Sequence, residues 1–211
     1  MRLGIFGGTF DPIHIGHLIL AEHCREACRL DRVLFVPAGQ PPHKTGQPIT
    51  SGKLRREMVE LAIAGHPAFG VSTIELDREG PSYSADTLTE ISRQDPHAEL
   101  FFLIGSDSLI DLPTWYDPDR IVSLATLVFA TRPSSNLPDF APLRSVLGDA
   151  RIEQLGKHVV QIPAVHISSS TIRARVASGQ TIRYLVPRAV ECFIETHKLY
   201  GAEGSRLSVD S

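Results

Sequence analysis

Residues 3–17 read Leu3-Gly4-Ile5-Phe6-Gly7-Gly8-Thr9-Phe10-Asp11-Pro12-Ile13-His14-Ile15-Gly16-His17. The apolar start of this stretch, residues 3–6, predicts a buried β-strand. The glycines after it favour a tight turn, and residues 16–29 have the apolar spacing of a helix. The stretch therefore predicts a strand, a glycine-rich loop and a helix N-terminus, in that order.

The rest of the chain repeats this alternation of short apolar runs with amphipathic stretches. Further strands are predicted over residues 32–37, 69–74, 99–104, 124–130 and 159–162, and further helices over 51–64, 84–93, 168–178 and 187–197. In the helix over 51–64 the inward face is expected to carry Leu54, Met58, Leu61 and Ala62. The alternation predicts an α/β fold with a doubly wound, mostly parallel sheet and helices on both faces.

Length and composition are those of an ordinary globular protein. The chain has 211 residues, 42% of them hydrophobic and 21% charged, which predicts one domain over residues 1–200 and a flexible polar tail over 201–211. Proline-rich loops are predicted over 38–50 and 131–142. No apolar run approaches the roughly 20 residues that span a bilayer. The apolar stretch at the N-terminus is too short for a signal peptide. Three cysteines, an odd number, favour a reducing compartment, so we expect a cytoplasmic protein.

The charge balance restricts the partners. Twenty-one basic and 24 acidic side chains give a net charge of −3, which argues against a general nucleic-acid surface, because such surfaces need many Lys and Arg contacts to phosphates. A small polyanion needs only a few local cations and backbone amides. We therefore expect no nucleic-acid and no membrane partner.

The loop after the first strand carries two histidines at a promising place. In open parallel sheets ligands bind beyond the carboxyl ends of the strands, and a helix N-terminus favours phosphate. His14 and His17 are three residues apart and can face one ligand, and Gly16 leaves space between them. The alternatives are a turn with incidental histidines or a structural zinc site, for which only His23, Cys24 and Cys28 are near. The pattern favours phosphate binding.

Residues 7–17 resemble the His-x-Gly-His signature of a nucleotidyltransferase superfamily and, more narrowly, the bacterial nicotinate-nucleotide adenylyltransferase family. Six further segments match that family in order, over residues 3 to about 200: Pro41-Pro42-His43-Lys44, Pro81-Ser82-Tyr83-Ser84-Ala85-Asp86-Thr87-Leu88, Gly105-Ser106-Asp107-Ser108-Leu109, Leu112-Pro113-Thr114-Trp115-Tyr116, Ile167-Ser168-Ser169-Ser170-Thr171-Ile172-Arg173 and Arg183-Tyr184-Leu185-Val186-Pro187. The short signature alone leaves phosphopantetheine adenylyltransferase open, and the longer set of matches argues against it.

The resemblance implies a Rossmann-like nucleotidyltransferase domain that transfers AMP from ATP to nicotinate mononucleotide, releasing pyrophosphate and forming deamido-NAD. The acceptor phosphate is itself the nucleophile, so catalysis consists of aligning two anions and neutralising the charge that develops between them. Mg²⁺ is expected to arrive with ATP, held by the nucleotide and water, and no protein-held metal site is expected. A monomer and a homodimer are both compatible with the sequence.

The resemblance also implies the ATP site. The catalytic residues implied are His14, His17 and Arg173. The residues implied to bind ATP are Gly8, Thr9, Phe10, His14, Gly16, His17, Lys44, Gly105, Arg132, Ile167, Ser168, Ser170 and Arg173. Taken alone, Ser168 would be an ordinary helix N-cap, and Lys44 and Arg132 would be exposed cations.

The acceptor site follows from the same resemblance. The residues implied to bind nicotinate mononucleotide are Thr9, Ser84, Ala85, Asp107, Trp115 and Tyr116. Trp115 would stack on the pyridine ring, while the Ser84 hydroxyl and the N–H groups of Ala85 and Tyr116 would bind the ring carboxylate. Ser84 replaces the usual threonine but keeps the hydroxyl. Asp11 is expected to fix the turn before Pro12.

Two other classes of function stay open. One is an adenylyltransferase for nicotinamide mononucleotide or another phosphate acceptor, because an amide and a carboxylate have nearly the same shape. The other is a non-catalytic nucleotide-binding module on the same fold. A fragment of a tRNA synthetase is disfavoured by the length and by the lack of a basic extension.

Overall fold

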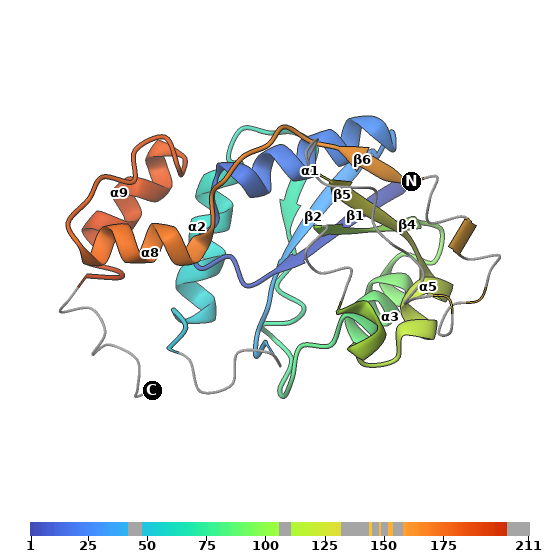
Figure 1. The fold of residues 1–211 in the computed structure, drawn as a ribbon. Helices are drawn as coiled ribbons and strands as arrows, with labels where there is room; N and C mark the ends of the chain where they lie inside the picture. The colour runs from blue at the N-terminus through green and yellow to red at the C-terminus, as the bar shows by residue number, and fades with distance from the viewer. Residues whose placement is uncertain are drawn as a thin grey trace.

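The computed structural model describes residues 1–41, 48–105, 111–131, 144, 148, 152–153 and 158–201 (Figure 1). Its main elements, in chain order, are β1 (Arg2–Gly8), α1 (Ile15–Ala27), β2 (Arg32–Pro37), α2 (Gly52–Ile63), β3 (Phe69–Val71), α3 (Ser84–Gln94), β4 (Glu99–Gly105), the 3₁₀ turn η2 (Leu112–Thr114), α5 (Pro118–Leu124), β5 (Ala125–Thr131), β6 (Val159–Gln161), α8 (Ser169–Ala177) and α9 (Arg188–Thr196).

The strands form one sheet in the order β3-β2-β1-β4-β5-β6, and every neighbouring pair in it is parallel. The chain builds one half outward from β1 to β3, then returns to the other side of β1 with β4 and builds outward to β6. The change of direction lies between β1 and β4, which is where open α/β sheets bind ligands. The predicted doubly wound parallel fold is confirmed.

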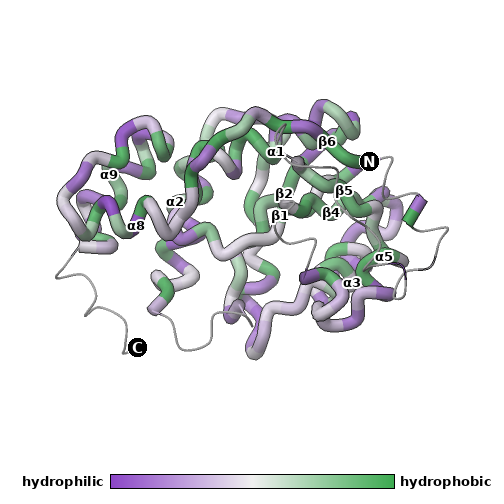
Figure 2. Tube along the Cα trace, viewed as in Figure 1, coloured by the Kyte–Doolittle hydropathy of each residue, from purple (hydrophilic) through white to green (hydrophobic). Residues whose placement is uncertain are grey.

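Apolar side chains fill two cores, one on each face of the sheet. Residues of α1, α2, α8 and α9 pack on one face, and residues of α3 and α5 pack on the other (Figure 1). Figure 2 shows the apolar residues concentrated along the central strands, as expected for strands that are covered on both sides. Cys24 of α1 and Cys28, which caps the end of that helix, belong to the first core and are buried. Within the described residues no helix combines the length and apolarity needed to cross a membrane.

Three local expectations need correction. The strand over 69–74 ends at Val71, because only three of its residues pair with β2. Leu61, expected to face inward, is exposed, and Arg55 is buried instead. Helix α5 was not expected at all, although Asp117 and Pro118 are a recognisable start: the Asp117 side chain accepts the N–H of Arg120, and proline suits the first helical position.

Candidate active site

The loop after β1 is held by burial of its own side chains. Phe10 and Ile13 are almost fully buried, and the Phe10 ring packs edge-on against Phe6 and His17. A Cβ on Gly8 would lie 2.9 Å from the Phe10 ring, so only glycine fits there. The Phe10 side chain therefore belongs to the core, and only its backbone is available to a ligand.

The two histidines of the loop stack on each other. His14 is the N-cap of α1, and its ring centroid lies 3.7 Å from that of His17, with 22° between the planes. The backbone N–H of His14 donates to Nδ1 of His17 at 3.2 Å. Because Nδ1 of His17 accepts this bond, the proton of the neutral ring sits on Nε2, which makes Nε2 a donor. A Cβ on Gly16 would lie 3.1 Å from Nδ1 of His14, so glycine keeps the pair from being pushed apart.

The first turn of α1 offers fewer backbone donors than expected. The N–H of Ile15 donates to the carbonyl of Leu185 at 3.0 Å, and the N–H of His17 donates to the carbonyl of His14 at 2.9 Å. Two N–H groups expected to face a phosphate are thus already bonded within the protein. The imidazoles, rather than a row of free amides, are the main donors at this helix end.

Burial sets the charge of His14. Only 7% of the residue is exposed, and Nδ1 has no hydrogen-bond partner among the described residues. Burial lowers the pKa of His14 from its ordinary 6.5 to about 4. The ring is therefore neutral at pH 7, where it can serve as a hydrogen-bond donor, and a bound polyanion would favour its protonation.

This lowered pKa predicts an acid-sensitive fold. Between pH 6.5 and pH 4 the unfolded state binds a proton at His14 and the folded state does not, so the free energy of unfolding falls as the pH falls through that window. The difference of about 2.5 pKa units corresponds to about 3 kcal/mol. Between pH 7 and pH 4, measured by urea unfolding, the free energy of unfolding of His14→Asn is expected to fall by about 3 kcal/mol less than that of wild type. His97→Asn, at an exposed site, is the control and should follow wild type. Equal pH slopes for His14→Asn and wild type would contradict the buried neutral ring.

Helix α8 brings the second predicted phosphate motif to the histidine loop. The Ser169 hydroxyl donates to the carbonyl of Pro12 at 2.9 Å, and Nη1 of Arg173 donates to the carbonyl of Asp11 at 2.7 Å. Ser168 is the N-cap, with its hydroxyl accepting the N–H of Thr171 at 3.1 Å. The N-termini of α1 and α8 therefore converge, and exposed Ser170 has its hydroxyl 2.9 Å from that of Ser168.

Asp11 was expected to fix the turn before Pro12, and its side-chain hydrogen bonds instead reach distant segments. Its buried carboxylate accepts the Tyr200 hydroxyl at 2.6 Å and the N–H of Thr50 at 3.3 Å. Burial, together with the Asp11 carboxylate, raises the pKa of Tyr200, so the phenol stays protonated and donates. The carboxylate thus ties the loop to the end of α9 rather than facing a ligand.

Arg55 of α2 is a key residue that the sequence analysis missed. It is 1% exposed, and its guanidinium donates to four backbone carbonyls: Nη1 to Thr9 at 2.7 Å, Nη2 to Ala38 at 2.6 Å and to Gly39 at 3.5 Å, and Nε to Thr50 at 2.8 Å. Burial lowers its pKa, and the Asp11 carboxylate opposes that shift. One buried cation therefore holds together the segments that follow β1 and β2. Because α2 also carries Lys53 and Arg56, no signal in the sequence singles out Arg55.

Hydrogen bonds extend this scaffold to the predicted acceptor site. The Ala38 N–H donates to the carbonyl of Gly8 at 2.9 Å, and the N–H groups of Gly39 and Gln40 donate to the Ser82 hydroxyl at 2.9 and 3.1 Å. Ser82 lies two residues before the start of α3. These hydrogen bonds therefore connect the ends of β1 and β2 to the segment that leads into α3.

The predicted acceptor residues lie on two adjoining segments. Ser84 and buried Ala85 open α3, while Trp115 and Tyr116 follow η2. The half-buried Trp115 ring stands edge-on to Phe102, with centroids 6.0 Å apart. The Tyr116 ring is 53% exposed and lies 4.6 Å from that of Tyr83, which connects the two segments.

The remaining predicted residues have these positions. Gly105 ends β4, where an added Cβ would meet no described atom within 4 Å, so packing does not require glycine. Ile167 is half-buried against the core just before α8. Lys44, Asp107 and Arg132 lie outside the described residues. Across the part of the chain that the structure describes, no three His, Cys, Asp or Glu side chains gather to hold a metal ion.

Comparisons with known proteins point in one direction. A sequence model of cytidylyltransferase-like proteins matches residues 5–175. A Thermomicrobium roseum protein named "Probable nicotinate-nucleotide adenylyltransferase" is 51% identical over 199 residues, covering 94% of this chain and 91% of the relative. A Thermus thermophilus protein of the same name is 48% identical over 200 residues, covering 95% and 100%.

Solved structures share the fold. A Plasmodium falciparum nicotinic acid mononucleotide adenylyltransferase complexed with NaAD superposes with a TM-score of 0.74 at 18% identity, covering 94% of this chain and 97% of the other. The same enzyme complexed with APC gives a TM-score of 0.74 at 17% identity and covers 94% and 96%. At these identities the likeness concerns the fold alone.

Proposed function

We infer the function from one premise: this chain belongs to the nicotinate-nucleotide adenylyltransferase family, among the cytidylyltransferase-like proteins. It transfers the adenylyl group of ATP to nicotinate mononucleotide, forming deamido-NAD and pyrophosphate in NAD biosynthesis. The observation that carries this assignment most strongly is the convergence of the α1 and α8 N-termini, joined by the bonds from Ser169 and Arg173 to the histidine loop. Two helix ends, a stacked imidazole pair and a guanidinium suit a polyphosphate.

The reaction requires no nucleophile from the protein. An oxygen of the acceptor phosphate forms a bond to the α-phosphorus of ATP as the bond from that phosphorus to the bridging oxygen of pyrophosphate breaks, and pyrophosphate leaves with the electron pair. Because the nucleophile is already ionised, the protein has to align two anions and stabilise the charge on the leaving group. Mg²⁺ carried by ATP would offset part of the triphosphate charge.

The phosphate end of the site is formed by the loop after β1 and the start of α8. His14, His17 and Arg173 are the catalytic residues, contacting the α-phosphate and the departing pyrophosphate. Further ATP contacts are assigned to Gly8, Thr9, the Phe10 backbone, Gly16, Lys44, Gly105, Arg132, Ile167, Ser168 and Ser170. The stacked imidazole pair supports this assignment, because the backbone bond to Nδ1 of His17 makes Nε2 of that ring a donor at the helix end.

The acceptor end is formed by the start of α3 and the turn before α5. Ser84 and the N–H groups of Ala85 and Tyr116 bind the ring carboxylate, Trp115 stacks on the pyridine, and Thr9 and Asp107 contact the rest of the mononucleotide. A site made of N–H donors favours a carboxylate over an amide, because the NH₂ of the amide would face another donor. The three free thiols, Cys24, Cys28 and Cys192, accord with a cytoplasmic location.

Trp115 gives a direct test of the acceptor end. We expect Trp115→Ala to raise the KM for nicotinate mononucleotide about 10- to 100-fold, because ring stacking contributes roughly 1–3 kcal/mol. The KM for ATP should stay within about twofold, since the ring is assigned no contact with ATP. Trp115→Phe, which retains a flat ring, is the matched control and should recover most of the affinity. Equal loss for both substrates would remove Trp115 from the acceptor site.

Product identification tests the function as a whole. The protein is mixed with ATP, Mg²⁺ and either nicotinate or nicotinamide mononucleotide, and pyrophosphate and the dinucleotide are quantified by mass spectrometry. Stoichiometric deamido-NAD and pyrophosphate, with slower conversion of the amide, are expected. ATP binding without pyrophosphate release would favour the non-catalytic module, and comparable turnover of the amide would remove the preference for nicotinate.

A further inference from the structure

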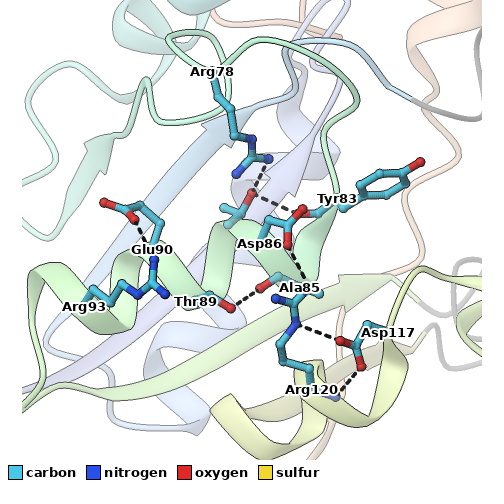
Figure 3. Close-up of polar contacts among 10 residues, drawn as sticks. Arg78, Tyr83, Ala85, Asp86, Thr89, Glu90, Arg93, Asp117 and Arg120 are labelled. Carbon is cyan, nitrogen blue, oxygen red and sulfur yellow. Dashed lines mark hydrogen bonds and ion pairs between the residues drawn. The ribbon is translucent and has the colours of Figure 1, made fainter.

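A single arginine joins the two segments of the acceptor site. Nη2 of Arg120 lies 2.7 Å from Oδ1 of Asp86, and Nε lies 2.9 Å from Oδ2 of Asp117. Its guanidinium carbon also lies 5.7 Å from the centroid of the Tyr116 ring. Figure 3 shows the Arg120 side chain rising from α5 between Asp117 and the first turn of α3.

Both carboxylates lie beside the groups assigned to the ring carboxylate of the acceptor. Asp86 is in the first turn of α3, next to Ala85, and Asp117 follows Tyr116 and caps α5. Arg78, the other arginine near the start of α3, donates to the Thr87 hydroxyl at 3.2 Å (Figure 3). Two negative charges at this place would repel an anionic acceptor, and Arg120 forms an ion pair with each of them.

Arg120 also fixes the geometry between the segments. Its bond to Asp86 links α5 to α3, and its position over the Tyr116 ring complements the contact between Tyr116 and Tyr83. The side chains of Arg120, Asp86 and Asp117 are 32%, 39% and 42% exposed, so solvent screens the pairs only in part. Arg120 thereby links the segment that carries Ala85 to the segment that carries Tyr116.

We propose that Arg120 is a positioning residue that determines acceptor specificity: by neutralising Asp86 and Asp117 it lets the pocket take a ring carboxylate in preference to a neutral amide. The proposal rests on the function proposed above. With Arg120 the cluster carries one net negative charge; without it the cluster carries two. The binding of a neutral acceptor depends far less on this difference in charge than the binding of an anionic acceptor does.

The first step of the test measures wild type with nicotinate and with nicotinamide mononucleotide, which checks the proposed function independently of Arg120. The second step measures Arg120→Gln, for which we expect the KM for nicotinate mononucleotide to rise about tenfold, as two partly exposed ion pairs allow. The KM values for ATP and for nicotinamide mononucleotide should stay within about twofold. Arg120→Lys, which keeps the charge, should retain the selectivity of wild type.

Two further variants separate charge from fold. Asp86→Asn combined with Arg120→Gln restores one net negative charge, and we expect it to recover most of the affinity for nicotinate mononucleotide. Arg93→Gln is the matched control at the other end of α3, where Arg93 pairs with Glu90 at 3.9 Å, and should behave as wild type (Figure 3). An unchanged selectivity in Arg120→Gln, an equal rise of KM for both acceptors, or no recovery in the double variant would overturn the proposal. A wild type that converts neither acceptor would instead overturn the proposed function.

Discussion

His14→Ala and His17→Ala are each expected to lower kcat for adenylyl transfer by about 10²- to 10³-fold, the usual loss when one preorganised donor to a developing charge is removed. The rings stack at 3.7 Å, and the backbone bond to Nδ1 of His17 leaves its Nε2 as a donor. Both rings are therefore oriented before substrate arrives. The loss should fall on kcat, because charge develops mainly in the transition state.

Steady-state assays of pyrophosphate release check this expectation. Both variants should fold as wild type at pH 7, where His14 is neutral in the folded and in the unfolded state. His197→Ala, at an exposed position after α9, is the matched control and should retain full activity. Near-normal turnover in either variant would remove that ring from the phosphate site.

Arg55→Met is expected to lower the free energy of unfolding by about 4 kcal/mol, because it removes the donor of four part-buried hydrogen bonds to backbone carbonyls, at roughly 1 kcal/mol each. Those carbonyls belong to Thr9, Ala38, Gly39 and Thr50, so the loops after β1 and β2 should loosen as well. The lysine of Arg55→Lys can donate to only some of these carbonyls, so its free energy of unfolding should lie between those of Arg55→Met and wild type.

Urea unfolding at pH 7 provides the measurement, and the neighbouring residue provides the control. Arg56 pairs with Glu60 at 3.3 Å on the outer face of α2, so Arg56→Met should change the free energy of unfolding by less than about 0.5 kcal/mol. If Arg55→Met and Arg56→Met lost similar amounts, the buried guanidinium would not be what holds the loops.

The strands could be predicted well because buried parallel strands are recorded in the sequence as short apolar runs. The strand over residues 32–37 matches β2 in both bounds, and the parallel order follows from strands alternating with helices. The histidine motif was found because its residues are contiguous. The approach of α8 to this motif joins residues more than 150 positions apart, and the resemblance predicted their shared role but no contact between them.

The scaffold of the site could not be predicted, for a physical reason. The spacing of apolar residues predicts which positions face the core, so a polar residue that faces the core is not found by it. Arg55 is buried because its partners are backbone carbonyls from loops, and no sequence pattern records carbonyls. Arg120 was missed because α5 itself was not predicted, so nothing in the sequence placed Arg120 and Asp117 beside the first turn of the predicted helix over 84–93, where Asp86 lies.

The central claim is that the start of α1 and the start of α8 together hold the triphosphate while the acceptor phosphate attacks it. A crystal structure with a non-hydrolysable ATP analogue and nicotinate mononucleotide measures this directly. The expected result has the phosphates within hydrogen-bond reach of the His14, His17 and Arg173 side chains, and the acceptor phosphate in line with the scissile bond. Phosphates bound elsewhere, with both imidazoles unchanged in the interior, would contradict the account.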